Sequence, residues 1–282
     1  MTIDENLIFT HLREHDRHRF LSSLLMGDNV RLPISVIYSF NAEISRIRDL
    51  IKEPLPGEIR LQWWREVTAE AARKDEASAN PLALAVNEVI NHHNINRASF
   101  DGYCRSRIFD LYDDPMPDKL TYEGYCGETA STLLQWSCQI IDSEVAKITA
   151  NACGHAGIAQ SVAGHLALLP QHLSRGQVYI PSEFLTECDI DRAQFLSAND
   201  KEAIAKILNL FVDYGEEHLA KARDEITKLP NHMPQVFLPL ASTARIYKKA
   251  RKLGAQACDT SVVPATWLSQ WDLWQSIRKG MI

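Results

Sequence analysis

The sequence predicts an all-α protein, and three observations lead to this expectation. Apolar residues recur at helical spacing along most of the chain, no segment shows the alternation of a β-hairpin, and glycine and proline are scarce at 12 each. The chain has 282 residues, of which 45% are apolar. Apolar burial alone can therefore stabilise the fold, without a disulfide or a metal. We expect one all-α domain over residues 1–282.

The helices in the first half of the chain are expected where an apolar stripe is bounded by proline or glycine. Helical stripes cover residues 20–25, 34–51 and 59–71, and another begins at Pro81, with breaks at 27–33, 54–57 and 115–117. A proline at the start of a helix is favourable because its missing N–H has no partner there in any case.

The second half of the chain is expected to be dominated by one long helical pattern. This pattern runs over residues 120–173 and carries many small side chains in its second part, which let helices approach closely. A loop is expected at 174–181. Three further amphipathic segments are expected at 199–229, 235–253 and 262–278.

The charge and cysteine content limit the classes of partner and the compartment. The formal net charge is −6, so no chain-wide positive field favours nucleic acid. The six cysteines show neither a CxxC motif nor a metal-ligand spacing, which is typical of buried thiols in a reducing compartment. The sequence contains no secretory signal and no apolar stretch of membrane-spanning length. We expect a cytoplasmic protein with at most peripheral membrane contact.

Several stretches resemble one known family over nearly the full chain. Residues 157–159 (Gly-Ile-Ala) and 174–181 (Ser-Arg-Gly-Gln-Val-Tyr-Ile-Pro) are similar to the second motif of the squalene/phytoene synthases and the loop that follows it. Residues 38–44 (Tyr-Ser-Phe-Asn-Ala-Glu-Ile) resemble the lead into the first motif. The resemblance implies the isoprenoid synthase fold, a single-domain helical bundle around a central cavity. Its walls would be the helices near 34–52, 58–74, 120–142 and 144–173.

The sequence departs from this family at the positions that would bind metal. Enzymes of the family use aspartates spaced along two helices to hold Mg²⁺, and through it a diphosphate. The resemblance places Ser45, Arg46 and Asp49 at the first motif, and Leu168, Gln171 and His172 at the second. Hydrocarbon, amide, hydroxyl and guanidinium groups cannot supply the hard anionic oxygens that Mg²⁺ needs. We therefore expect no catalytic residue, no metal site and no cofactor.

A degenerate branch of the family lacks these aspartates and is known from mitochondrial complex I assembly factor 6. Residues 40–44 and 128–131 resemble that branch. The resemblance implies a non-catalytic protein that binds a lipid or a partner protein.

Two alternatives stay open. One is a prenyl-diphosphate transferase for head-to-head condensation, with Mg²⁺ ligands relocated for example to Asp110, Asp113 and Asp114, although a solvated helix end also explains this cluster. The other is a scaffold whose cavity is filled by its own side chains.

An arginine at a former aspartate position suggests that an anion is bound directly, without metal. The candidate residues for this cavity and anion site are Tyr38, Glu43, Arg46, Asp49, Arg65, Arg105, Arg175 and Tyr179. In the alternative interpretation, the arginines form stabilising ion pairs with Glu43, Asp49 and Glu66. His165 and His172 are seven residues apart, roughly 10 Å along a continuous helix, which is too far for joint metal binding without a third ligand.

A stripe of Trp267, Trp271 and Trp274 lies near the C-terminus, followed by Arg278 and Lys279. A terminal amphipathic helix usually packs its apolar face on its own domain, so core packing is the first expectation. The alternative is a peripheral contact with a membrane, because tryptophan favours the bilayer interface and basic residues favour anionic headgroups.

Overall fold

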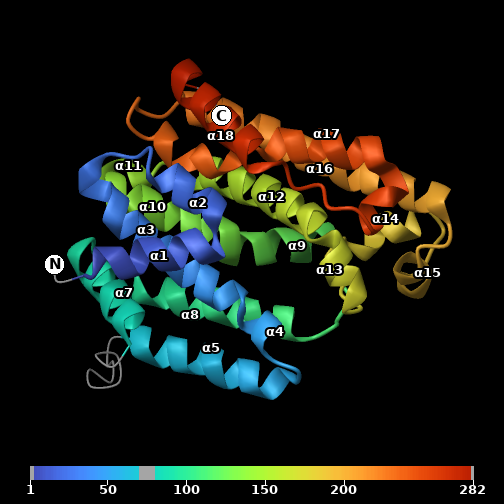
Figure 1. Cartoon of the computed structure of the whole chain (residues 1–282), viewed down its shortest axis with the longest axis horizontal. Coiled ribbons are helices and arrows are strands. Elements are labelled where there is room, and N and C mark those ends of the chain that lie inside the picture. The colour runs from blue at the N-terminus through green and yellow to red at the C-terminus, as the bar shows by residue number, and fades with distance from the viewer. Residues whose placement is uncertain (1–2, 70–79, 281–282) are drawn as a thin grey trace. The chain divides into compact units, whose positions relative to one another are not determined.

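The computed structural model describes residues 3–69 and 80–280, and every regular element in those ranges is a helix (Figure 1). The predicted all-α class is confirmed. The chain divides into two compact units: unit 1 comprises residues 1–112, 132–150 and 229–239, and unit 2 comprises 113–131, 151–228 and 240–282. The single domain and the central cavity stay predictions.

Unit 1 is built around the buried helix α3. Its helices are α1 (Glu5–His15), α2 (Arg17–Ser23), α3 (Asp28–Ser45), α4 (Ile47–Leu50), α5 (Pro54–Thr68), α7 (Pro81–His92), α8 (Arg97–Ser106), η1 (Arg107–Leu111), α10 (Thr132–Ile141) and α11 (Ser143–Ala146), with the 3-10 segment η3 at Pro234–Leu240. Helix α3 packs against α1, α2, α7 and α10 (Figure 1). Its position explains why twelve of its residues are buried.

The core of unit 1 is an aromatic cluster centred on Phe40 of α3. The Phe40 ring lies 5.1 Å from Trp64 of α5 and 5.4 Å from Phe100 of α8. Phe100 in turn stacks on Trp136 of α10, with ring centroids 3.9 Å apart. Edge-to-face and stacked aromatic pairs contribute about 0.5–1.5 kcal/mol each beyond their buried area. The cluster therefore fixes four helices around one side chain.

The predicted break at 27–33 is shorter in the structure. Helix α3 begins at Asp28 and includes Pro33. Pro33 has no N–H group and cannot donate to the carbonyl of Asn29, four residues earlier. Asn29 lies in the exposed first turn of the helix, so water can bond that carbonyl instead. The expected helix at 58–74 is observed as α5, which ends at Thr68, and residues 70–74 lie outside the described part of the chain.

Unit 2 is organised around the long helix α16. Its elements are α9 (Lys119–Cys126), the π-helical segment η2 (Gly127–Ser131), α12 (Ala150–Ala167), α13 (Leu169–Ser174), α14 (Ser182–Thr186), α15 (Arg192–Ser197), α16 (Lys201–Thr227), α17 (Thr243–Leu253), η4 (Gly254–Cys258) and α18 (Thr266–Lys279). Helix α16 packs against α17 and η4. The buried Tyr247 hydroxyl of α17 donates to the Ala159 carbonyl of α12 at 2.6 Å.

The prediction of long helices through 120–142 and 144–173 is wrong in detail, because this stretch is interrupted several times. The backbone widens into a π-helical turn at 127–131 and ends a helix before Asp142. The Asp142 carboxylate then accepts from the backbone N–H groups of Glu144 and Val145, which starts α11. The break at Asp142 coincides with the predicted boundary, whereas the π-helical turn at 127–131 and the breaks at 147–149 and 168 fall inside the predicted helices. The loop expected at 174–181 is confirmed from Arg175 onward.

The tryptophan stripe does not pack in the core, so the first expectation for it is wrong. Helix α18 buries Leu273 and Ser276, which lie on a different face from the stripe. Trp267, Trp271 and Trp274 remain 67%, 50% and 48% exposed. The apolar face of α18 is therefore its outward face.

The close approach of α12 to η2 requires glycine at one position. A Cβ on Gly157 would lie 2.5 Å from the backbone nitrogen of Ser131 and 2.7 Å from its Cα, closer than backbone atoms can tolerate, whereas a Cβ on Gly154 would meet open space. Both glycines lie within α12.

We predict that Gly157→Ala lowers the free energy of unfolding by about 1–3 kcal/mol, because overpacking outweighs the gain in helix propensity. The matched control Gly154→Ala should leave stability unchanged or raise it by up to about 1 kcal/mol. Chemical denaturation of the two variants checks the prediction, and equal stabilities would contradict the observed contact.

Candidate functional site

The first motif position lies where α3 ends in unit 1. Ser45 is the last residue of α3, Arg46 follows as its cap, and Asp49 lies on the short helix α4. Ser45 and Asp49 are exposed, and Arg46 is half-buried. Because the helix is interrupted at Arg46, the three residues do not form a continuous face of the kind that holds Mg²⁺.

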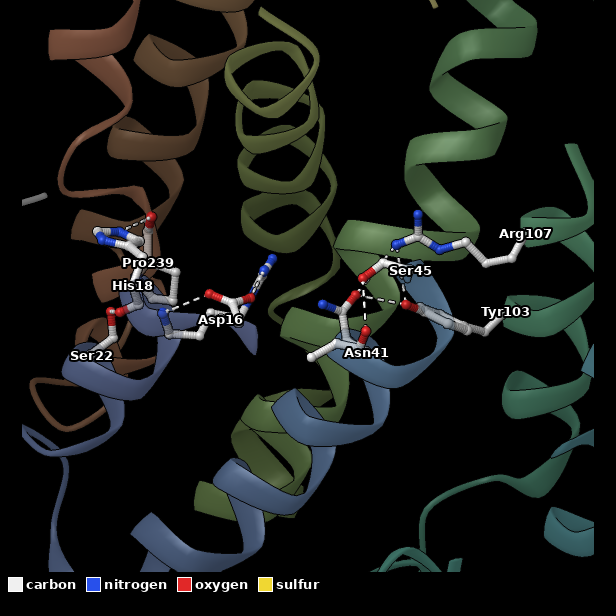
Figure 2. A network of polar contacts seen from close by, with 10 residues as sticks. Asp16, His18, Ser22, Asn41, Ser45, Tyr103, Arg107 and Pro239 are labelled. Atoms are coloured by element: carbon white, nitrogen blue, oxygen red, sulfur yellow. Dashed lines mark hydrogen bonds and ion pairs between the residues drawn. The ribbon is translucent and has the colours of Figure 1, made fainter. Parts of the chain in front are cut away.

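A hydrogen-bonded cluster lies directly beside this helix end. The buried Tyr103 hydroxyl donates to Asn41 Oδ1 at 2.7 Å, and Arg107 donates to the same Asn41 oxygen at 3.3 Å and to the Tyr103 hydroxyl at 3.1 Å. Figure 2 shows the Arg107 side chain directed at Asn41 and Tyr103. Arg107 also forms an ion pair with Asp110 at 3.1 Å. A cation with fixed partners therefore lies beside Asn41, one helical turn before Ser45.

The second cluster in Figure 2 has a structural role. His18 Nε2 lies 3.0 Å from the Pro239 carbonyl, and the Ser22 hydroxyl donates to the His18 carbonyl. Asp16 caps α2 and pairs with Arg19 at 2.6 Å. These contacts tie the start of α2 to η3 within unit 1.

Tyr38 lies under Arg19, whose guanidinium carbon is 5.7 Å from the ring centroid. The side chain is fully buried. Burial raises the pKa of Tyr38 to about 12. Tyr38 therefore stays neutral near pH 7 and contributes a hydroxyl rather than a negative charge.

Glu43 and Arg46 are brought together with two histidines of α1. His11 Nε2 lies 3.4 Å from Glu43 Oε2. The hydrogen bond from His11 and the nearby positive charge of Arg46 lower the pKa of Glu43, against the opposing effect of burial. Burial and the charge of Arg46 lower the pKa of His15. Glu43 is thus an ionised carboxylate that already has its partners.

Arg65 and Arg105 share one carboxylate that the sequence did not single out. The Nε atoms of Arg65 and Arg105 lie 2.6 Å and 2.5 Å from the two oxygens of Asp101. Burial acts to raise the pKa of Asp101, but the hydrogen bonds from both arginines lower it overall. These contacts favour the ion-pair interpretation for Arg65 and Arg105, with Asp101 as the partner instead of Glu43, Asp49 or Glu66. Their anion-binding role stays a prediction.

The second motif position lies at a helix break in unit 2. Helix α12 ends at Ala167, Leu168 caps the next helix, and Pro170 lies in the first turn of α13. Leu168 is exposed, Gln171 is half-buried and His172 is buried. Pro170 therefore separates two helices, which changes the geometry expected for a continuous one.

Imidazole and phenol rings lie close together beside this helix break. The rings of His165 and His172 are 5.9 Å apart, closer than the roughly 10 Å of a continuous helix. Tyr179 stacks on His165 with centroids 4.2 Å apart and lies 4.7 Å from His172. The Tyr122 hydroxyl lies 2.9 Å from His165 Nδ1. Arg175 caps the end of α13 and is half-buried.

A further cluster in unit 2 was missed by sequence reasoning. His155 Nδ1 of α12 lies 3.1 Å from His218 Nδ1 of α16, and His218 Nε2 lies 3.8 Å from Glu123. The Tyr214 hydroxyl donates to Glu123 at 2.9 Å. The only signal in the sequence was that His218 falls on the apolar stripe of its helix, seven residues after Phe211.

Metal ligands are not grouped in the residues that the structure describes. Within 3–69 and 80–280, no set of three or more histidine, cysteine, aspartate or glutamate side chains is placed to hold an ion. Two nitrogens that face each other at 3.1 Å, as in His155 and His218, share one proton instead.

The His155–His218 contact predicts a loss of stability in acid. Burial, followed by the neighbouring His155, lowers the pKa of His218 below its ordinary value of 6.5. Its stabilising contribution is therefore complete above pH 6.5 and is lost as the pH falls through the lowered value. We expect the temperature at the midpoint of thermal unfolding to decrease as the pH is lowered from 7.5 to 5. The variant His218→Asn should show a smaller decrease over the same pH range. The exposed control His92→Asn should keep the wild-type profile, and a His218→Asn profile parallel to wild type would contradict the assignment.

The sequence of this chain is similar to those of known proteins. The sequence profile of the squalene/phytoene synthase family matches residues 12–275. A similar protein is the complex I assembly factor 6 of Rattus norvegicus, 25% identical over 86% of this chain and 72% of that protein. The Homo sapiens protein of the same name is also 25% identical, over 86% of this chain and 72% of its own length. A homolog from Dictyostelium discoideum is 21% identical over 88% and 70%, respectively.

Solved structures show the same fold. A squalene synthase from Alicyclobacillus acidocaldarius superposes with a TM-score of 0.73 at 17% identity, covering 89% of this chain and 94% of that one. A dehydrosqualene synthase gives a TM-score of 0.76 at 14% identity, covering 98% and 97%. The expected isoprenoid synthase fold is confirmed. The family profile covers residues 12–275, and this chain belongs to the squalene/phytoene synthase family.

Proposed function

We propose that this protein is a non-catalytic member of its family that binds a hydrophobic, isoprenoid-like ligand or a partner protein in the assembly of respiratory complex I. The observation that carries the proposal is the chemistry at the two motif positions. Of the residues at those positions only Asp49 is a carboxylate, and the Arg107 guanidinium bonds to Asn41, one helical turn before Ser45 (Figure 2). The names of the relatives, which are assembly factors, support the same conclusion.

The residues present do not fit the Mg²⁺ that the family implies. Mg²⁺ is held by carboxylates in near-octahedral geometry, and two diphosphates would need several such groups. Glu43 is engaged by His11 and Asp110 by Arg107, while Asp49 lies exposed on α4. The second motif supplies an alkyl, an amide and an imidazole group. No step of prenyl transfer is therefore derived for this chain.

The alternative of a relocated metal site receives little support. Asp110 is largely buried and neutralised by Arg107 at 3.1 Å. Asp113 and Asp114 are exposed beside Pro115, as expected for a solvated chain segment. The assembly-factor relatives also do not favour a transferase.

We also infer a cytoplasmic location with contact limited to the surface of a membrane. The six cysteines form no disulfide and five of them are buried, which supports a reducing compartment. No helix in the described part of the chain is long and apolar enough to cross a bilayer.

The first test is a direct assay of catalysis. Purified protein incubated with Mg²⁺ or Mn²⁺ and labelled farnesyl or geranylgeranyl diphosphate should release no diphosphate, because the ligand set for the metal is missing. An active squalene synthase assayed in parallel is the positive control. Turnover that is abolished by Asp49→Asn or Asp110→Asn would contradict the proposal and establish the transferase alternative.

The second test addresses the assembly role in cells. Deleting the gene should lower the amount of assembled complex I on native gels and the NADH oxidation that depends on it. The wild-type chain and the double variant Asp49→Asn, Asp113→Asn should both restore assembly, since both carboxylates are exposed and no metal role is assigned to them. Normal complex I in the deletion strain, or rescue by wild type alone, would contradict the proposal.

A further inference from the structure

Helix α18 presents an apolar face to the outside of unit 2. Trp267, Trp271, Trp274 and Ile277 are spaced three or four residues apart and are 67%, 50%, 48% and 47% exposed. The indole rings of Trp271 and Trp274 lie 5.0 Å apart and form one continuous surface. Val263, just before the helix, is also 50% exposed. A patch of three exposed tryptophans needs a specific explanation, whereas single exposed apolar residues do not.

The opposite side of α18 already holds the helix in place. Leu273 is 1% exposed and Ser276 is buried. Asp272 accepts from Arg245 Nε of α17 at 2.7 Å and from the Ser242 hydroxyl at 3.2 Å. The tryptophans are therefore not needed to attach α18 to its unit, and their substitution is expected to spare the fold.

Three basic side chains, Arg278, Lys279 and Lys249, lie near this face or the segment that leads to it, in a chain that is acidic as a whole. Residues 241–282 contain seven lysines and arginines against two aspartates, whereas the rest of the chain carries a net negative charge larger than the total of −6. Arg278 lies 5.2 Å from the Trp274 ring, and Lys279 ends the helix beside it. Lys249 of α17 donates to the Val263 carbonyl at 3.2 Å, which places it where the segment leading to α18 begins.

We propose that the tryptophan face of α18 binds the surface of an anionic lipid bilayer. Indole rings prefer the interfacial depth, and the nearby basic groups match the negative headgroups. The charge complementarity selects a bilayer over an apolar protein surface, which would gain nothing from the lysines. The tryptophan face is thus the part of the protein that would make the peripheral membrane contact proposed above. This proposal holds whether or not the protein turns over prenyl diphosphates.

The test uses the full-length purified chain and vesicles of phosphatidylglycerol and phosphatidylcholine in equal parts. The wild type should co-sediment with these vesicles, bind pure phosphatidylcholine vesicles about tenfold less, and lose binding as salt is raised. Its tryptophan emission should shift to the blue as the indoles leave water.

The decisive variant is Trp271→Glu, Trp274→Glu, which should weaken binding to the mixed vesicles by about tenfold or more. The matched control is Leu55→Glu, Ile59→Glu on α5, which places the same two charges on residues that are 65% and 62% exposed. The control should bind as the wild type does. Circular dichroism and the unfolding midpoint must show that both variants are folded.

Several outcomes would overturn this proposal. They are failure of the folded wild type to bind the mixed vesicles, unchanged binding by the α18 variant, or an equal loss in the α5 control. A concentration-dependent dimer that dissociates in the α18 variant would identify this face as a protein interface instead. The diphosphate-release assay is unaffected by any of these results, so the two proposals fail separately.

Discussion

The guanidinium of Arg107 defines the chemistry of unit 1. It is held by Asn41 of α3, the Tyr103 hydroxyl and Asp110, and it lies one helical turn before Ser45, the last residue of α3 (Figure 2). A partly buried, hydrogen-bonded cation disfavours a second cation nearby. The presence of Arg107 is therefore consistent with the lack of carboxylates at Ser45 and Arg46, the positions that the family resemblance assigns to the first motif.

In unit 2 the second motif position also carries no carboxylate, and there the helix itself is interrupted. Helix α12 ends before Leu168 and α13 begins after it, with Pro170 in its first turn, and His165, His172 and Tyr179 form a cluster in which His165 and Tyr179 are stacked. Such a stack is rigid and carries no fixed negative charge at neutral pH. It can line the wall of an apolar binding site, and it cannot coordinate a hard cation in the way that a row of aspartates does.

The packing of the two units does not depend on the residues at the motif positions. The Phe40 cluster and the close contact of Gly157 with Ser131 depend on shape, and neither involves a residue of the former metal motifs. Shape-dependent packing tolerates loss of the catalytic groups, because those groups contribute little to burial. Under the proposed function the same fold acts as a binding protein, and the tryptophan face of α18 is a surface separate from the motif positions.

The sequence by itself determined the helical class, most of the helix positions and the missing carboxylates, because apolar periodicity, proline and glycine act locally and residue types at motif positions can be compared directly. It failed where a side chain competes with the backbone or finds a distant partner. A predicted helix is interrupted by the π-helical turn at 127–131, where the Thr129 hydroxyl donates to the Tyr125 carbonyl. Asp101 pairs with Arg65 and Arg105, and His155 contacts His218, which is 63 residues away in the sequence. Only the tertiary structure decided which face of α18 is buried. The periodicity of the sequence identifies the tryptophan face as the apolar one, but the helix packs on its unit through the other face, which carries Leu273 and Ser276.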